Sequence, residues 1–485
     1  MPAIKSRDLL EQVDGLVGQG IEWLTISHHR RRLGRVGWRA ALDPADEPWA
    51  AGDPRPRPGN DVRVMVDGGE ALAAMVSEIR AARSHVHVTG WHLNPTFAMT
   101  GDDPPAVLRA LLAEAAKGVK VRVLLWAGAP IPLFRPTRRD MHRVRQQLCQ
   151  GSDVECALDA RERPMHCHHD KTIVIDDRVA FVGGIDLTDL GGDRLDQPDH
   201  PTRDGIGWHD AAVRIEGPAV QDVASHFRDR WQATTEQELP SPVAQGSVGT
   251  TELQVVRTIP DGMYRALPRG EFRILEAYVA ALRSASRFIY LENQFLWSPE
   301  ILAILRMKLR HPPNDSFRLV ILLPAKANNG ADDTRGQLGT LIRADGGGHR
   351  LLACTLVAPG GQAGRPVYVH AKIGIVDDHW LTVGSANLNE HSLFNDTEVN
   401  VVIRDVAVVR EARERLWAEH LDVPRAAVAG DPIQVVDTLW KPTAQEQADR
   451  RERGEPPSHR LTTLPGLSRR SGLILGPLQG LTVDA

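Results

Sequence analysis

Two histidine–lysine pairs with the same spacing are the residues of this chain best suited to chemistry. His169 lies two positions before Lys171 in the stretch HDKTIVIDD, and His370 lies two positions before Lys372 in HAKIGIVDD. An imidazole can act as a nucleophile or as a general acid, and an ammonium group can hold the oxygens of a phosphate. Each pair therefore predicts a site for an anion with a reactive centre.

The stretches that contain the two pairs are copies of one another. Residues 169–187 and 370–388 align without a gap at an offset of 201, and 7 of 19 positions are identical. Only 8 of the 58 basic residues are lysine, which singles out the lysines beside the histidines. An internal repeat of this kind predicts two similar structural units. The identical positions are His169/His370, Lys171/Lys372, Asp176/Asp377, Asp177/Asp378, Val182/Val383, Gly183/Gly384 and Leu187/Leu388.

Two copies permit a mechanism with two histidines. In a strand, residues two apart point to the same face, so each histidine points the same way as its lysine. If a pseudo-twofold axis brings the copies face to face, the histidines stand on opposite sides of one phosphorus atom. One histidine would attack and form a phosphohistidine, while the other protonates the leaving alcohol and then activates water.

Helical and strand patterns alternate around both copies. The apolar runs GVKVRVLLW (118–126) and SFRLVILLP (316–324) have the pattern of buried strands that follow a helix. Each copy is followed by a strand and by a helix that ends in Trp231 or Trp417. This alternation predicts an α/β fold.

The length and composition predict two domains. A chain of 485 residues is too long for one ordinary core, and its 42% apolar and 25% charged residues are typical of a globular protein. The joint is expected in residues 238–252, which are rich in Pro, Gly and Ser. We predict an N-terminal extension at 1–60, catalytic domains at 61–240 and 250–425, and an extended or disordered C-terminal tail at 426–485.

Charge, hydropathy and cysteine usage narrow the class further. A protein that binds nucleic acid usually carries an excess of basic residues, whereas the net charge of this chain is −4. No apolar run is long enough to cross a bilayer. The N-terminus has no apolar signal core, and the four cysteines form no CxxC pair. These features predict a cytoplasmic protein with reduced thiols.

The run HCHH at 166–169 raises a competing hypothesis, a zinc site built from Cys and His. His168 and His169 are adjacent, however, and would point to opposite faces of a strand. The second copy keeps only His370 in the corresponding run. We therefore predict no metal and no cofactor, with His166 and His168 at the rim of the site, either touching the substrate or solvated.

The paired H-x-K-x-x-x-x-D motifs, followed by G-G-x-D and G-S-x-N, resemble those of the phospholipase D superfamily. GGIDL (183–187), WHD (208–210) and YLENQF (290–295) are similar to its phospholipase branch. The resemblance covers about residues 60–425. It implies two similar α/β/α sandwich domains related by pseudo-twofold symmetry, with the active site at their interface. It also implies a metal-independent phosphohistidine mechanism.

The resemblance assigns roles to the motif residues. His169 would be the nucleophile and His370 the general acid and base. Lys171 and Lys372 would hold the phosphate oxygens. The motif aspartates, Asp176 and Asp377, are grouped with this catalytic set, although we expect them mainly to fix the hairpin turns that IDDR and VDDH predict.

Further residues are implied around the phosphate. Asn387 would donate to it, and Asp186, at the equivalent position of the first copy, would face a cationic head group or make a structural contact. Asp210 and Glu398 would orient the two histidines, and the sequence leaves open which carboxylate serves which histidine. The resemblance also makes Glu292, Asn293 and Gln294 candidates for the floor of the site, and Ser385 a candidate for its support.

The implied substrate is a phospholipid of the phosphatidylcholine type, converted to phosphatidic acid and a head-group alcohol or to an exchanged lipid. A nuclease with the same histidines is an alternative that the mild negative charge disfavours. A second alternative is a cardiolipin-synthase-like phosphatidyltransferase, and a third is a membrane-binding adaptor that has lost catalysis. We expect a monomer in peripheral contact with a membrane, without nucleic acid. The basic segment 135–147 is either a solvated helix face or a contact for an anionic lipid or nucleic-acid backbone.

Overall fold

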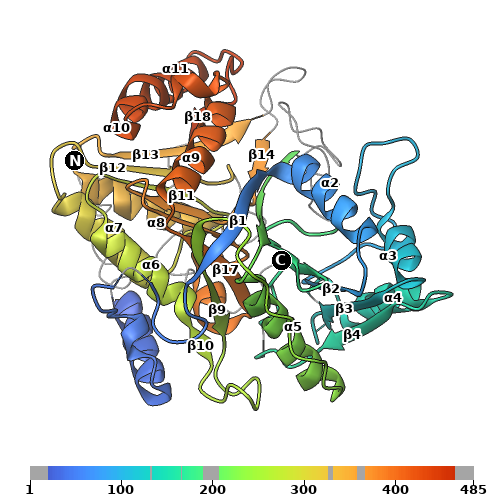
Figure 1. Ribbon diagram of the computed structural model, residues 1–485. Coiled ribbons are helices and arrows are strands. Elements are labelled where there is room, and N and C mark those ends of the chain that lie inside the picture. The colour runs from blue at the N-terminus through green and yellow to red at the C-terminus, as the bar shows by residue number, and fades with distance from the viewer. Residues whose placement is uncertain are drawn as a thin grey trace.

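The computed structural model describes residues 20–47, 49–131, 134–164, 166–188, 207–325, 331–357 and 366–464. Two β-sheets dominate it, and each carries helices on both faces (Figure 1). The elements follow one another in the same order in the two halves of the chain.

The first sheet has the strand order β4-β3-β2-β5-β6-β8-β1. Its β2, β3 and β4 are parallel neighbours, and the other pairings are antiparallel. Helices α2, α3 and α4 pack on one face and α5 on the other. The bounds are β1 Arg57–Val66, α2 Asp67–Arg80, β2 His85–Gly90, α3 Leu108–Ala116, β3 Lys120–Trp126, α4 Arg138–Cys149, β4 Glu155–Asp159, β5 Thr172–Ile175, β6 Val179–Gly183, β8 Ala211–Glu216 and α5 Val220–Thr235.

The second sheet repeats this plan in the order β13-β12-β11-β15-β16-β17-β9. Helices α6, α7 and α8 cover one face, and α9 covers the other. The bounds are β9 Thr251–Ile259, β10 Glu271–Phe272, α6 Arg273–Ser284, β11 Phe288–Glu292, α7 Pro299–Arg310, β12 Arg318–Leu322, α8 Ala331–Asp345, β13 Leu351–Val357, β15 Ile373–Val376, β16 Trp380–Gly384, β17 Glu398–Ile403 and α9 Val406–Leu421. The predicted fold class, a repeated α/β/α sandwich, is confirmed.

Strand pairing joins the halves at several points. β1 pairs with β8 of its own sheet, and its residues Arg57 and Asn60 also pair with β9 of the other. The short strand β7 (Gly207–His209) runs parallel to β14 (Pro366–Val369) of the second half. His168 forms an isolated bridge with Thr397. These cross-pairings bring both histidine–lysine motifs to the seam between the halves.

Each motif strand ends in a tight hairpin turn, as the sequence predicts. The central residues are Asp176 and Asp177 in one turn and Asp377 and Asp378 in the other, with φ between +53° and +55°. Two consecutive positive φ angles define a type I′ turn, which matches the twist of an antiparallel hairpin. Aspartate tolerates this left-handed backbone better than most side chains do.

The end of the chain differs from the expected extended or disordered tail. Segments α10 (Pro432–Val435), η4 (Val436–Trp440) and α11 (Lys441–Glu452) are helical, and β18 (Leu461–Thr463) pairs with β13. The Trp440 ring is fully buried and stands 5.6 Å from that of Trp417 in the core. Residues 465–485 lie outside the described ranges, and the domain boundaries stay predictions.

Replacement of Trp440 tests whether this segment is an integral part of the core. We expect Trp440→Ala to lower the free energy of unfolding by about 3–5 kcal/mol, because a fully buried indole leaves a large cavity. Thr438→Ala, at an exposed site in the same segment, should change it by less than about 0.5 kcal/mol. Equal unfolding midpoints for the two variants would contradict the packing described here.

Candidate active site

The two motif histidines lie where one half of the chain meets the other. His169 and His370 stand just before β5 and β15, and each is 5% exposed. The backbone N–H of His169 donates to Thr397 O at 2.9 Å, and that of His370 donates to His209 O at 2.8 Å. Each motif is therefore fastened by its backbone to the opposite half.

The carboxylates that orient the histidines also come from the opposite half. His169 Nδ1 donates to Glu398 Oε1 at 3.0 Å, and His370 Nδ1 donates to Asp210 Oδ2 at 2.7 Å. Glu398 and Asp210 occupy equivalent positions in the two sheets. Glu398 lies two residues before the strand partner of Gly384, and Asp210 lies two residues before the strand partner of Gly183. A proton held at Nδ1 leaves Nε2 as the ring nitrogen that can attack or transfer a proton. The geometry thus answers which carboxylate serves which histidine.

Glu398 is held by two hydroxyl groups. Ser392 Oγ donates to Oε1 at 2.6 Å, and Ser385 Oγ donates to Oε2. Burial raises the pKa of the Glu398 carboxyl well above its ordinary value, and the ammonium group of Lys171 works in the opposite direction. Burial also raises the pKa of Asp210. Both carboxyl groups therefore hold protons more readily in the seam than they do in water.

The two lysines are buried beside their histidines. Lys171 Nζ donates to His169 O at 2.8 Å, and Lys372 Nζ donates to His370 O. Burial lowers the pKa of Lys372 to about 7, while the charge of Asp210 opposes the shift. Burial, together with the charges of Lys372 and Lys171, lowers the pKa of His370 well below its ordinary value. Two ammonium groups beside a neutral imidazole suit the binding of an anion.

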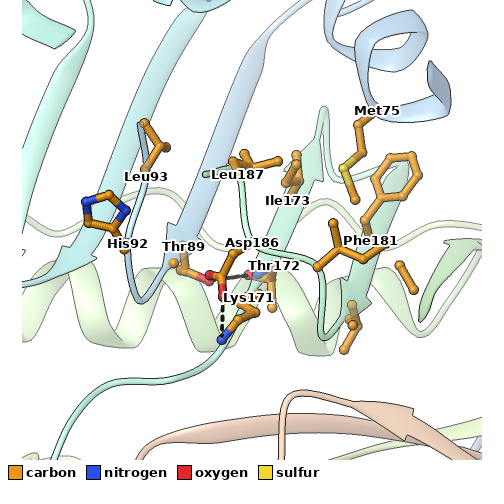
Figure 2. Close-up of a pocket in the computed structure, with 15 residues that line it drawn as sticks. Met75, Thr89, His92, Leu93, Lys171, Thr172, Ile173, Phe181, Asp186 and Leu187 are labelled. Carbon is orange, nitrogen blue, oxygen red and sulfur yellow. Dashed lines mark hydrogen bonds and ion pairs between the residues drawn. The ribbon is translucent and has the colours of Figure 1, made fainter. Parts of the chain in front are cut away.

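The residues at the ends of the two motif hairpins break the symmetry of the site. Asp186 lies 3.4 Å from Lys171 Nζ, whereas Asn387 Nδ2 donates to Gln294 Oε1 at 3.4 Å. Asp186 Oδ1 is buried and has no hydrogen-bond partner among the described residues. Asp186 and Lys171 stand at one end of a cavity of about 20 Å³ whose other walls are mainly apolar (Figure 2). That volume holds about one water molecule.

Two of the three floor candidates from YLENQF, Gln294 and Asn293, differ in role. Gln294 Nε2 donates to Tyr368 Oη at 2.9 Å, and Gln294 Oε1 lies 3.4 Å from Lys372 Nζ, so this side chain belongs to the site. Asn293 Oδ1 instead accepts from the backbone N–H of Leu388 at 3.0 Å, behind the second motif. Asn293 therefore supports the site from the interior.

The motif aspartates lie at the far end of the motif strands. Asp176 Oδ1 accepts from the backbone N–H of Ser84 at 2.8 Å, and Asp377 Oδ1 accepts from that of Phe288 at 2.7 Å. Five residues of extended chain, about 16 Å, separate Asp176 from Lys171. Grouping the two aspartates with the catalytic residues is therefore corrected: they tie each hairpin turn to the start of the neighbouring strand.

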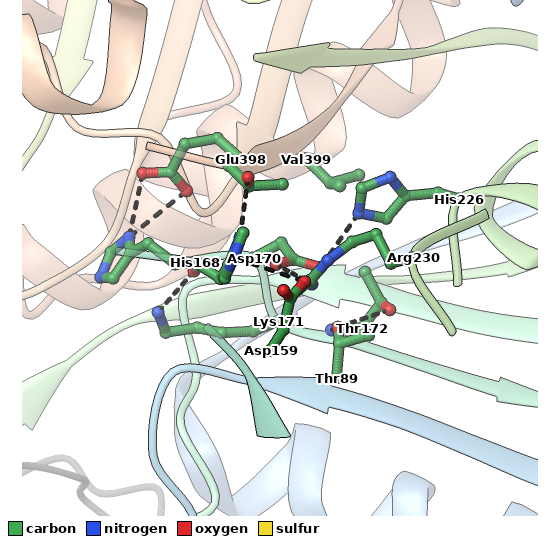
Figure 3. Close-up of polar contacts among 12 residues, drawn as sticks. Thr89, Asp159, His168, Asp170, Lys171, Thr172, His226, Arg230, Glu398 and Val399 are labelled. Carbon is green, nitrogen blue, oxygen red and sulfur yellow. Dashed lines mark hydrogen bonds and ion pairs between the residues drawn. The ribbon is translucent and has the colours of Figure 1, made fainter. Parts of the chain in front are cut away.

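A buried ionic network behind the first motif was missed in the sequence (Figure 3). Asp170 accepts from Arg230 Nη1 at 2.5 Å and lies 3.0 Å from His226 Nε2. His168 Nε2 lies 3.3 Å from Asp159 Oδ2. His168 is 1% exposed, so its expected place at the rim is wrong. The alternation of side chains along a strand does predict that His168 points away from His169. The sequence around the first motif gives no sign of Arg230, because that residue is about 60 positions away.

Among the described residues, three groups of side chains, two of which share His209, have ligand types and spacings that could hold a metal ion; the third consists of Asp67, His209 and Glu419. His166 Nδ1 lies 2.9 Å from His391 Nδ1 and 3.5 Å from Asp396 Oδ1. Behind Asp210, Glu292 lies 2.8 Å from His209 and 3.0 Å from His420. The separations of 2.8, 2.9 and 3.0 Å also fit direct hydrogen bonds. The sequence missed the partners of His166 because they come from the other half, and the predicted absence of a metal stays a prediction.

Comparisons with known proteins match both halves of the chain. A family model described as cardiolipin synthase, PLD-like domain, matches residues 75–195 and 278–419. The chain is 27% identical over 453 residues to phospholipase D A of Dictyostelium discoideum, covering 74% of this chain and 35% of that protein. It is 26% identical over 475 residues to phospholipase D2 of Bos taurus, covering 72% and 50%. The chain thus spans half or less of these relatives.

A shorter relative and a solved structure give similar matches. The major cardiolipin synthase ClsA of Bacillus subtilis is 24% identical over 368 residues, covering 73% of this chain and 67% of that protein. The crystal structure of phosphatidylserine synthase from Haemophilus influenzae superposes with a TM-score of 0.51 at 12% identity, covering 81% of this chain and 94% of that one. The structural likeness supports the fold.

Removing the charge of either orienting carboxylate tests the crossed arrangement. We expect Glu398→Gln and Asp210→Asn each to lower kcat for a phosphodiester on the order of 10³-fold, because the histidine loses its tautomer and its stabilised cation. Steady-state kinetics with KM reported separately checks this. Asp176→Ala should leave kcat within about twofold and lower the free energy of unfolding by roughly 1–3 kcal/mol. A fall in kcat with Asp176→Ala that matches the other two would contradict the assignment.

The lowered pKa of Lys372 predicts the alkaline limb of the pH profile. The free protein loses this positive charge as the pH rises through about 7, so kcat/KM should fall above that pH. Bound phosphate favours the ammonium form, so kcat should fall only at higher pH. Lys372→Arg keeps its charge and should shift the kcat/KM limb to higher pH, even at a lower rate. If the alkaline limb of the kcat/KM profile does not shift in Lys372→Arg, the limb reports the titration of another group.

Proposed function

The chain belongs to the phospholipase D superfamily, and we propose that it transfers the phosphatidyl group of a glycerophospholipid to water or to an acceptor alcohol. The observation that carries the proposal is the crossed pair of hydrogen bonds, His169 to Glu398 and His370 to Asp210. They orient two imidazoles in one seam, beside two buried lysines. A phosphodiester needs this combination, a nucleophile and an acid on opposite sides of an anionic centre.

In the first step, His169 Nε2 attacks phosphorus and the bond to the head-group oxygen breaks. The products are a phosphatidyl–histidine and the head-group alcohol, whose oxygen takes its proton from His370 Nε2. Lys171 and Lys372 stabilise the charge on the remaining phosphate oxygens. Burial and the two ammonium groups lower the pKa of His370; a bound phosphate offsets the positive charges, so substrate binding favours the protonated acid.

In the second step, His370 takes a proton from water or from an alcohol, and the resulting oxygen nucleophile attacks phosphorus. The P–N bond breaks and His169 is released. Water gives phosphatidic acid, and an alcohol gives a new phospholipid. The relatives include both phospholipases D and a cardiolipin synthase. We extend the proposal to donors of the phosphatidylcholine type and to either acceptor.

The asymmetry between Asp186 and Asn387 supports a division of labour between the halves. Asn387 can donate to a phosphate oxygen, whereas a carboxylate at Asp186 repels one. The ion pair of Asp186 with Lys171 removes part of that repulsion. With 12% of its side chain exposed, Asp186 is also placed to attract a cationic head group as it enters beside the first motif.

A donor with a good leaving group separates the two histidines experimentally. With a phosphatidyl nitrophenyl ester the leaving group needs no proton, so His370→Ala should release about one equivalent of nitrophenol per enzyme and then stall. His169→Ala should release none. Both reactions are run in EDTA, and the stalled enzyme should carry an acid-labile, alkali-stable phosphatidyl label.

Three results would count against the proposal. A burst with His169→Ala and none with His370→Ala would exchange the two roles. Full turnover in both variants would remove the phosphohistidine mechanism. Loss of the wild-type burst in EDTA would make the reaction metal-dependent. Single-stranded DNA, offered in the same buffer, should not be cut. Cleavage of the DNA in place of the lipid ester would favour the hypothesis that the protein is a nuclease.

A further inference from the structure

The helix formed by residues 20–36 has an apolar end that no described part of the chain covers. It stands below α6 as the dark-blue helix at the lower left of Figure 1. Trp23 is 66% exposed and its neighbour Leu24 is 57% exposed. An indole with two thirds of its surface in water, beside an exposed leucine, is a costly arrangement for a freely dissolved helix.

Three arginines continue the same exposed face toward the C-terminal end of the helix. Arg30, Arg31 and Arg35 are exposed, and Leu24, Arg31 and Arg35 lie seven and four residues apart, which places them on one side of a helix. Within the described ranges, none of the three arginines forms an ion pair or a side-chain hydrogen bond. The face therefore combines an apolar end with three uncompensated positive charges.

The opposite face fastens the helix to the segment that supports the active site. His29 Nδ1 lies 2.8 Å from Glu300 Oε1, and its ring stacks on Phe394 at 3.8 Å. Arg32 donates to Asn395 Oδ1 and to Phe394 O, at 2.8 and 2.9 Å. Phe394 and Asn395 belong to η2 (His391–Asn395), the turn whose Ser392 holds Glu398. The helix is thus a fixed part of the molecule.

The other basic helix, α4, lacks this combination. Arg135 pairs with Asp140 at 2.7 Å and Arg138 pairs with Glu162, so part of its charge is neutralised. No large apolar side chain of α4 is exposed. Its Arg139 and Arg145 are exposed without an ion pair in the described chain, and they offer a matched control.

We propose that Trp23, Leu24, Arg30, Arg31 and Arg35 form the surface by which this protein docks on a bilayer that contains anionic lipid. Tryptophan and leucine enter the boundary between head groups and acyl chains, while arginines pair with lipid phosphates. No helix in the described residues is long and apolar enough to cross a membrane. The inference rests on the proposed function, because donor and product are bilayer lipids and the phosphatidic acid produced is itself anionic.

Vesicle sedimentation tests the surface without turnover. The probes are vesicles of phosphatidylcholine alone and with about one third phosphatidylglycerol, and every protein carries His169→Ala so that no lipid is consumed. The protein with an unchanged helix surface should bind the mixed vesicles at least about tenfold more tightly than the neutral ones. The pair Arg30→Glu and Arg31→Glu, and separately the pair Trp23→Ser and Leu24→Ser, should each weaken that binding at least about tenfold. The α4 control, Arg139→Glu with Arg145→Glu, should bind within about threefold of the unchanged surface.

The outcomes separate this inference from the proposed reaction. Unchanged binding in both helix variants, equal losses in the α4 control, or binding of single-stranded DNA in place of vesicles would overturn the docking surface. With His169 restored, each helix variant should turn over a short-chain, monomeric nitrophenyl ester at the wild-type rate, because the anchored face of the helix is intact. Absence of that turnover in the wild type would contradict the proposed function and leave the binding result valid.

Discussion

The rest of this structure depends on one constraint: each motif histidine is oriented by a carboxylate from the other half of the chain. A buried imidazole, a buried ammonium group and a buried carboxylate are each costly away from water, and they become tolerable only as mutual partners. His169 has its partner in Glu398 and His370 has its partner in Asp210. Neither half contains both members of either histidine–carboxylate pair, so each pair forms only when both sheets have folded and met.

The architecture follows from that requirement. One half-site consists of a strand that begins at the seam, a hairpin closed by an aspartate, and a return strand that leads back to the seam and carries a small residue; duplication supplies the second. Strand β1, the β7–β14 pairing and the bridge from His168 to Thr397 lock the two copies in register. Because the copies are not identical, Asp186 and Asn387 give the two sides of the seam different electrostatics.

The sequence predicts what is local and repeated. Spacing alone identifies His169 and His370 from among the other histidines, and two consecutive aspartates predict the hairpin turns. Contacts between distant segments leave no such trace. The 229 residues between His169 and Glu398 and the 160 between His370 and Asp210 hide the crossing. The place of Trp440 in the core was hidden for the same reason, since a Pro- and Arg-rich segment has no periodicity that indicates its partner strand.

The most direct test of a single site shared by the two copies is a crystal structure of the protein with orthovanadate or tungstate bound. We expect one anion in the seam, with the Nε2 atoms of His169 and His370 on opposite sides of the metal atom and one of them bonded to it. Lys171, Lys372 and Asn387 should contact its equatorial oxygens. An anion bound by one histidine while the other stays turned away, or two anions bound separately in the two halves, would contradict a single site shared by the two copies.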